Sequence, residues 1–183
     1  MRLIWALILA TIVIGLVVWL VMPSGNSGAG KDVSPRATAT PTTTPPNVAA
    51  VDRLLHLLPP GIDPGDCVAE ATTANAIAKF SCENAGPSTA TLTLARDDAS
   101  LKASFETVLK DLTTATCPGN ILSPGPWHSN NTPQQNSGTL VCGFHKDVPM
   151  VAWTTDNELL LSTVQAAGRH LTLDQLYNWW QSQ

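Results

Sequence analysis

The chain has 183 residues, is 44% hydrophobic and carries a formal net charge of −4 at pH 7. Three of its ten Lys and Arg residues and one of its fourteen Asp and Glu residues precede residue 48, which leaves seven basic and thirteen acidic side chains in residues 48–183. Nucleic acids and anionic lipid surfaces are bound through clustered basic side chains, so this acidic part is not expected to bind either of them.

An uncharged apolar segment, residues 3–22, opens the chain directly after Arg2. Its twenty residues would span roughly 30 Å as a helix, which is the hydrocarbon thickness of a bilayer. The segment is longer than the apolar core of a cleaved signal peptide, which has about 7–15 residues. We therefore predict a transmembrane signal-anchor helix over residues 1–22. Cleavage is the alternative, with Ser27-Gly28-Ala29 as the nearest small-residue site.

The charges around this segment favour a cytoplasmic N-terminus. Arg2 and the free amino group precede it, whereas the first cation after it, Lys31, is offset at once by Asp32. Positive charge is preferentially retained on the cytoplasmic side of a membrane. The predicted localisation is therefore the cell membrane, with a single pass and an extracytoplasmic C-terminal domain.

Residues 23–47 differ in composition from both of their neighbours. They contain five Pro, five Thr, three Gly and three Ser residues and no Leu, Ile, Phe or Trp. Such a sequence buries too little apolar surface to offset the entropy of ordering, so we predict a disordered linker. Its Thr-Pro clusters are also typical of O-glycosylated stalks.

All four cysteines lie in the third predicted segment, residues 48–183, whose size suits a single domain. Gaps of 14, 34 and 24 residues separate Cys67, Cys82, Cys117 and Cys142. Zinc ligands are usually more closely paired, and an even cysteine count beyond a membrane anchor favours two disulfides. Sequence permits three pairings. We favour Cys67–Cys82 and Cys117–Cys142 because each closes a short loop onto an expected strand.

Hydrophobic periodicity and capping residues predict three helices in this domain. A short helix covers residues 51–58 and is stopped by a Pro-Pro-Gly sequence. The longest helix begins at Asp97 or Asp98, carries an apolar stripe and ends near Thr114. The last helix follows a capping box that starts at Thr172.

Alternating apolar residues predict about five strands, joined by turn residues, with a polar loop over residues 119–137. The expected strands are residues 76–82, 89–95, 138–145, 149–154 and 158–164. Strands that are segregated from flanking helices indicate an α+β domain with an antiparallel sheet.

Five short motifs occur in order along this domain: LLHLLPPG at 54–61, SPGPW at 123–127, CG at 142–143, VAWT at 151–154 and LYNWW at 176–180. In these motifs the domain resembles extracytoplasmic domains of actinobacterial, especially mycobacterial, membrane proteins, some of them receptor Ser/Thr protein kinases. The resemblance covers roughly residues 51–181 and implies a disulfide-bonded, sensor-like module with no catalytic residues to carry over. Since this chain opens with its own apolar segment, we expect no signalling through a kinase domain of the same chain.

No motif predicts an enzyme or a metal centre. The four His residues are scattered, with no His-x3-His pair and no His/Cys cluster, and neither Gly-x-Ser-x-Gly nor Ser-x-x-Lys occurs. The carboxylate pairs at 97–98 and at 63 and 66 fit a helix cap and a turn. We therefore expect no catalytic residue, no cofactor and no metal ion.

Two aromatic positions are candidate ligand or partner surfaces. Trp127 lies beside His128 in a loop bounded by Pro and Gly, where it could contact a sugar or peptide or fold back on the core. Trp179 and Trp180 are adjacent on the last predicted helix and cannot both face the core. Because Trp180 lies on the apolar stripe, we expect Trp179 to be the more exposed of the two.

The leading hypothesis is a non-enzymatic, membrane-anchored extracytoplasmic binding or sensor-like module whose ligand is an unidentified protein, peptide or glycan. A cell-envelope hydrolase with no recognisable motif and a structural envelope protein are the alternatives. Facing carboxylates in a deep cleft, or a His beside a Ser, would favour the hydrolase. A groove lined by Trp would favour binding.

Overall fold

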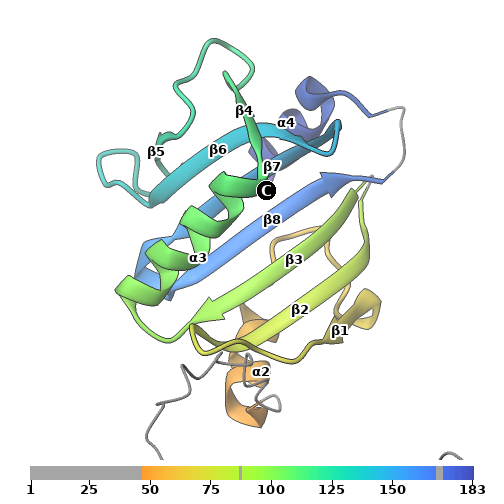
Figure 1. Cartoon of the computed structure of the whole chain (residues 1–183), viewed down its shortest axis with the longest axis vertical. Coiled ribbons are helices and arrows are strands. Elements are labelled where there is room, and N and C mark those ends of the chain that lie inside the picture. The colour runs from red at the N-terminus through yellow and green to blue at the C-terminus, as the bar shows by residue number, and fades with distance from the viewer. Residues whose placement is uncertain (1–46, 87, 168–170) are drawn as a thin grey trace, which may run out of the picture. The chain divides into compact units, whose positions relative to one another are not determined.

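A computed structural model describes residues 47–86, 88–167 and 171–183 of the chain (Figure 1). The predicted membrane helix and the predicted linker up to residue 46 lie outside these residues. Within the described part, no helix combines the length and the hydropathy needed to cross a bilayer. The described residues confirm the α+β class, with an antiparallel sheet of eight strands and three α-helices.

The helices are α2 (Val48–His56), α3 (Asp98–Asp111) and α4 (Leu173–Gln181). Each begins at a side chain that accepts backbone N–H groups of the first turn: Asn47 for α2, Asp97 for α3 and Thr172 for α4. The predicted capping box of α4 is confirmed, since Thr172 and Gln175 bond to each other's backbone. The longest helix ends at Asp111, earlier than expected, because Thr113 and Thr114 join the sheet instead.

The strands are β1 (Cys67–Ala69), β2 (Ala76–Ala85), β3 (Ser88–Ala95), β4 (Thr113–Ala115), β5 (Gly125–Trp127), β6 (Gly138–His145), β7 (Val148–Thr155) and β8 (Leu160–Ala166). Their order in the sheet is β1-β2-β3-β8-β7-β6-β4, and β5 also pairs with β6. The five longest are those that alternation predicts. The expected number of about five strands is nevertheless too low. β1, β4 and β5 have only three residues each, which is too short to show an alternation of apolar and polar residues. β5 also lies inside residues 119–137, which we expected to be a loop.

Tight turns join the long strands. Lys146 and Asp147 connect β6 to β7 with φ values of 51° and 66°, the left-handed pair expected in a two-residue hairpin loop. Between β7 and β8 a 3-10 turn, Asp156–Glu158, is followed by Leu159 at a φ of 55°. This longer connection moves the start of β8 to Leu160, two residues later than expected.

Helices cover both faces of the sheet (Figure 1). On the α3 face, the predicted stripe of α3, including Leu101 and Phe105, packs on Val141, Ala152 and Leu161 of β6, β7 and β8. On the opposite α2/α4 face, buried residues of α2 and α4 join a larger cluster with all five long strands. Alternation along each strand therefore supplies two separate apolar surfaces.

Both predicted disulfides are confirmed. Cys67–Cys82 joins β1 to β2, and Cys117–Cys142 anchors the segment after β4 to β6. All four cysteines belong to or pack against the cluster of the α2/α4 face. The two covalent links thus stabilise the same side of the sheet.

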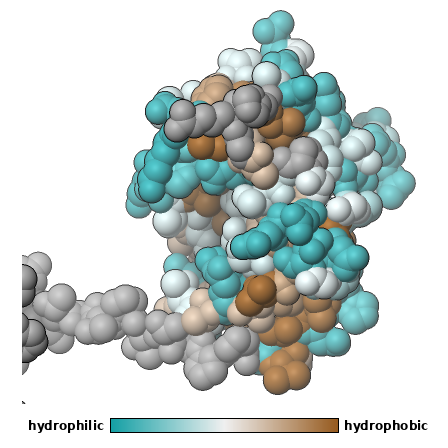
Figure 2. Space-filling model, turned by 90° about the vertical axis from the view of Figure 1, so that its right-hand side faces the viewer, coloured by the Kyte–Doolittle hydropathy of each residue, from teal (hydrophilic) through white to brown (hydrophobic). Residues whose placement is uncertain are grey.

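Figure 2 shows the domain from the side on which Figure 1 draws β1 and β2. Exposed apolar side chains gather at its lower end, near α2, and polar side chains cover much of the remainder. In α2 the exposed apolar residues are Val48 and Leu55, and in β1 it is Val68. These are separate exposed side chains, which are common on protein surfaces.

Candidate functional site

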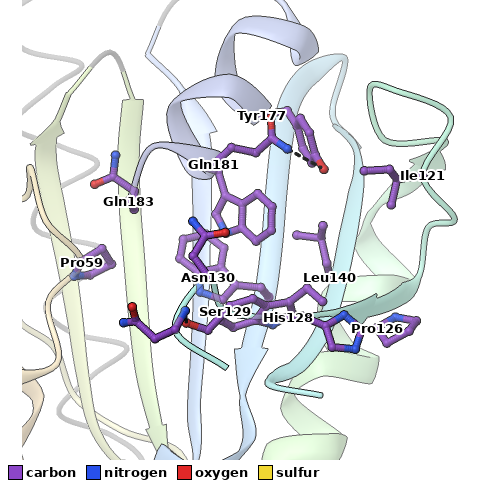
Figure 3. A pocket seen from close by; sticks show the side chains of 14 residues that line it. Pro59, Ile121, Pro126, His128, Ser129, Asn130, Leu140, Tyr177, Gln181 and Gln183 are labelled. Atoms are coloured by element: carbon purple, nitrogen blue, oxygen red, sulfur yellow. Dashed lines mark hydrogen bonds between the residues drawn. The ribbon is translucent and has the colours of Figure 1, made fainter. Parts of the chain in front are cut away.

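A cavity of about 640 Å³ opens on the α2/α4 face (Figure 3). It lies between α4, strands β6 and β7, and the loop that follows β5. Small-molecule sites typically have volumes of roughly 300–1,000 Å³, are largely apolar and contain a few converging polar groups. The size of this cavity falls inside that range, so its lining decides what it can hold.

Four aromatic rings, together with Pro59, Ile121, Pro126 and Leu140, form the apolar part of the lining. Trp180 of α4 lies at their centre, with its ring centroid 5.9 Å from Trp127, 6.0 Å from Trp153 and 5.4 Å from Tyr177. The two tryptophan contacts are edge-to-face, an arrangement that the ring quadrupoles favour. The rings come from β5, β7 and α4, so the antiparallel pairing of β5, β6 and β7 brings them together.

Trp127 both covers the core and lines the cavity. Its half-buried ring packs against the large cluster, and its indole N–H donates to the carbonyl of Thr154 at 2.7 Å. The Thr154 hydroxyl in turn donates to Asp156 and accepts from the backbone N–H of Thr139. Trp127 therefore folds back on the core, as one of the two alternatives predicts, and the same ring also forms part of the cavity wall.

Polar side chains approach the cavity from two sides. Figure 3 shows Tyr177 and Gln181 on α4 at one side, and His128 and Ser129 from the loop after β5 at the other. Gln181 donates to the Tyr177 hydroxyl at 3.5 Å. Asn130 and Asn131 are exposed, and within the described part of the chain their side-chain amides have no hydrogen-bond partner. These two amides are free to bind a ligand.

The side chains of the lining carry no fixed charge. None of the described residues around the cavity is Asp, Glu, Lys or Arg. Burial raises the pKa of Tyr177, so its phenol stays neutral at physiological pH. His128 is exposed and is the only histidine among the described residues of the lining.

The sequence-predicted surface residues separate into two groups. Trp127 and His128 line the cavity, whereas Trp179 lies against the turn between β2 and β3, on the other side of α4. A Cβ atom on Gly86 would lie only 2.7 Å from the indole nitrogen of Trp179. Trp179 and Trp180 are both half-buried, so neither is the plainly exposed member of the pair.

Several lining residues were not predicted as ligand contacts. The sequence predicts Trp153 and Trp180 as core or rim residues and Tyr177 as part of the apolar stripe of the last helix. Gln181 and Gln183 lie beyond that stripe and carry no motif. The strand register that places Trp153 of β7 and Gly125 of β5 on either side of Leu140 of β6 is not visible in the sequence. The consecutive aromatic residues near the C-terminus are the nearest available signal.

The arrangement offers stacking and hydrogen bonding. His128 and Ser129 are neighbours in the chain, but the Ser129 hydroxyl accepts a hydrogen bond from the backbone N–H of Asn131 at 3.3 Å. Among the described residues, no hydrogen bond joins the side chains of His128 and Ser129. Nor do those residues include a cluster of His, Cys, Asp and Glu able to hold a metal ion. No protein-family model, curated protein or solved structure matches the chain.

Proposed function

We propose that this protein is a membrane-anchored binding module of the cell envelope, in which residues 48–183 form a non-enzymatic, sensor-like domain outside the cytoplasm. The observation that carries the proposal is the cavity on the α2/α4 face. It combines four aromatic rings with unpaired amide groups and has no charged side chain. Such a lining binds a ligand by contact area and hydrogen bonds.

Three features support the location. The apolar segment at residues 3–22 is long enough to span a bilayer and follows the positive charge of Arg2. The two disulfides suit an oxidising compartment, since cytosolic thiols are kept reduced. The Pro/Thr-rich linker would hold the domain away from the membrane surface. The domain would then meet its ligand in the envelope.

The same lining supports binding over the two alternatives. A hydrolase needs a nucleophile with a base, or facing carboxylates, and the described lining has no Asp or Glu side chain and no His–Ser hydrogen bond. Trp153 and Tyr177 are buried, but Trp127 and Trp180 are only half-buried. A purely structural domain gains nothing from leaving these two rings partly open to water, since each Å² of apolar area that stays unburied gives up roughly 25 cal/mol of stabilisation. A ligand that covers Trp127 and Trp180 explains why they remain accessible.

A cavity-blocking variant tests the binding proposal. Ile121 lines the cavity and Leu122, its neighbour, does not, although Leu122 is the more exposed at 73% against 38%. The full chain would be incubated with the low-molecular-mass fraction of the cell envelope and examined by native mass spectrometry. We expect a bound mass that Ile121→Trp removes and Leu122→Trp retains. The absence of any bound mass, or equal occupancy in both variants, would contradict the proposal.

Topology requires a separate test. A phosphatase reporter fused after Gln183 should be active only outside the cytoplasm, and the mature chain should stay in the membrane fraction. Reporter activity in the cytoplasm would reverse the orientation. A soluble mature form that starts near Gly30 would show that residues 1–22 are a cleaved signal peptide.

A further inference from the structure

The lining of the cavity also indicates a ligand class. Resting on the proposed binding function, we propose that the cavity takes a neutral carbohydrate, with a sugar ring stacked on the aromatic residues around Trp180 and its hydroxyl groups bonded to the amide rim.

Charge is the first restriction. Phosphates, uronic acids and acidic peptides are bound through Arg or Lys, and protonated amines mainly through carboxylates, although aromatic rings also attract cations. The described lining offers neither, although the domain around it carries thirteen acidic and seven basic side chains. A charged ligand would lose its hydration here without gaining a counter-charge. A neutral ligand is therefore favoured.

The aromatic rings give the second restriction. A pyranose presents C–H groups on its faces and hydroxyl groups around its edge. The faces of Trp and Tyr rings are electron-rich and attract such polarised C–H groups, while the flat contact excludes water. Trp153 and Tyr177 are buried and pack on Trp180, with ring centroids 6.0 Å and 5.4 Å away. The half-buried Trp127 and Trp180, whose centroids are 5.9 Å apart, offer the apolar surface on which a sugar ring can lie.

Amide side chains supply the hydrogen bonds that the edge of a sugar needs. Each sugar hydroxyl both donates and accepts hydrogen bonds. An amide side chain likewise carries hydrogen-bond donors and an acceptor without a formal charge. Asn130 and Asn131 come from the loop after β5, whereas Gln181 and Gln183 come from the end of α4 and the residues after it. The amide nitrogens of Gln181 and Gln183 donate to the Tyr177 hydroxyl and the Trp179 carbonyl, and their amide oxygens are acceptors. A sugar ring on Trp180 would therefore meet amide groups from two segments of the chain.

Size and shape favour a compact ring over an extended chain. Peptides are commonly held along a free strand edge or in a groove of aromatic ridges. Here the rings converge on Trp180 in a hollow of about 640 Å³. That hollow suits a mono- or disaccharide, or the end of a longer glycan.

The test uses the full chain in an amine-oxide detergent, because glycoside detergents would present sugar headgroups to the cavity. Calorimetric titration with neutral methyl glycosides and disaccharides of glucose, galactose, mannose and N-acetylglucosamine should give saturable binding. We expect Trp180→Ala and the pair Asn130→Ala/Asn131→Ala to weaken binding at least tenfold. Thr132→Ala and Gln134→Ala, exposed in the same loop but outside the cavity, should leave it unchanged.

The outcomes separate the two proposals. Tighter binding of glucuronate or glucosamine than of glucose would overturn the carbohydrate inference through its charge argument. Cavity-dependent binding of a Pro-rich peptide with no sugar bound would also overturn it and leave the binding function intact. The same holds if an envelope molecule other than a sugar is removed by Ile121→Trp. If neither sugars nor envelope molecules bind, both proposals fail.

Discussion

The two faces of the sheet are closed in different ways. One helix of 14 residues, α3, closes the α3 face through a single apolar stripe. The α2/α4 face has two helices of nine residues each, both disulfides and a connecting loop, and it still contains an open cavity. One face is completed by a continuous segment, and the other is assembled from segments far apart in the chain.

This difference separates structural from functional roles. Residues of the α3 face should affect stability alone, because their side chains point away from the cavity. Residues of the α2/α4 face serve two purposes, since Trp127, Trp153 and Tyr177 belong to or pack on the core cluster and also line the cavity. Substitutions confined to one face should therefore show whether stability and ligand binding are separable.

The largest expected loss of stability is on the α3 face. Phe105 is buried with 7% of its surface exposed, so Phe105→Ala should lower the free energy of unfolding by about 3–5 kcal/mol. Denaturant titration measures this loss. At temperatures where the variant is folded, its affinity for the ligand should equal that of the wild type. A folded variant with weakened binding would show that the two faces are coupled.

Removal of a disulfide should come next. Replacing Cys117 and Cys142 by Ala should cost about 2–5 kcal/mol and weaken ligand binding, because this link anchors the segment that carries Ile121. The Cys67–Cys82 disulfide closes a shorter loop, with a sequence separation of 15 against 25 residues. Replacing Cys67 and Cys82 should therefore cost slightly less stability and leave ligand binding in the cavity unchanged. Melting curves and titrations on both double variants decide this. Native thiol labelling should detect no free cysteine, and labelling of all four would refute both links.

A smaller effect is expected at the turn beneath Trp179. Gly86 has a φ of 62°, and an added Cβ would crowd the indole of Trp179. Gly86→Ala should cost about 1–2 kcal/mol from the left-handed backbone, plus a steric contribution. Gly119→Ala is the matched control, since φ is 81° there and no atom lies within 4 Å of the added Cβ. Equal losses in both variants would mean that Trp179 does not pack tightly on this turn.

The smallest effect concerns the pH dependence of the α3 cap. Hydrogen bonds from the backbone and side chain of Ser100 hold the pKa of Asp97 below its usual 3.8. Because the folded pKa is the lower one, this stabilisation is present above pH 3.8 and is lost as the pH falls through the folded value. Asp97→Asn should therefore flatten the acid side of the stability profile. Asp98→Asn, which keeps the cap, is the control, and identical profiles for the two would refute the assignment.

Local signals in the sequence predicted most of the fold. Alternation located β2, β3, β6, β7 and β8, and capping residues located α3 and α4. Both disulfide pairings followed from short loops that close onto these strands. The three-residue strands β1, β4 and β5 were missed because they exist only through pairing with a neighbour, as Gly125–Trp127 does with β6.

The site was less predictable because it depends on contacts between distant segments. Trp127 and His128 stood out by their loop composition. The role of Trp153 depends on its register with Leu140, and that of Trp180 on how α4 lies across β7. Helical periodicity placed Trp180 on the apolar side of α4 but could not show that a cavity lies there.

Fluorine NMR of the full chain with all six tryptophans replaced by 5-fluorotryptophan tests the central claim most directly. Signals would be assigned by single Trp→Phe variants and followed during titration with the best-binding neutral sugar. We predict that the resonances of Trp127, Trp153 and Trp180 shift in a saturable manner while that of Trp179 stays in place. A shift of Trp179 alone, or no shift of Trp180 at saturation, would contradict the assignment of the α2/α4 cavity as the binding site.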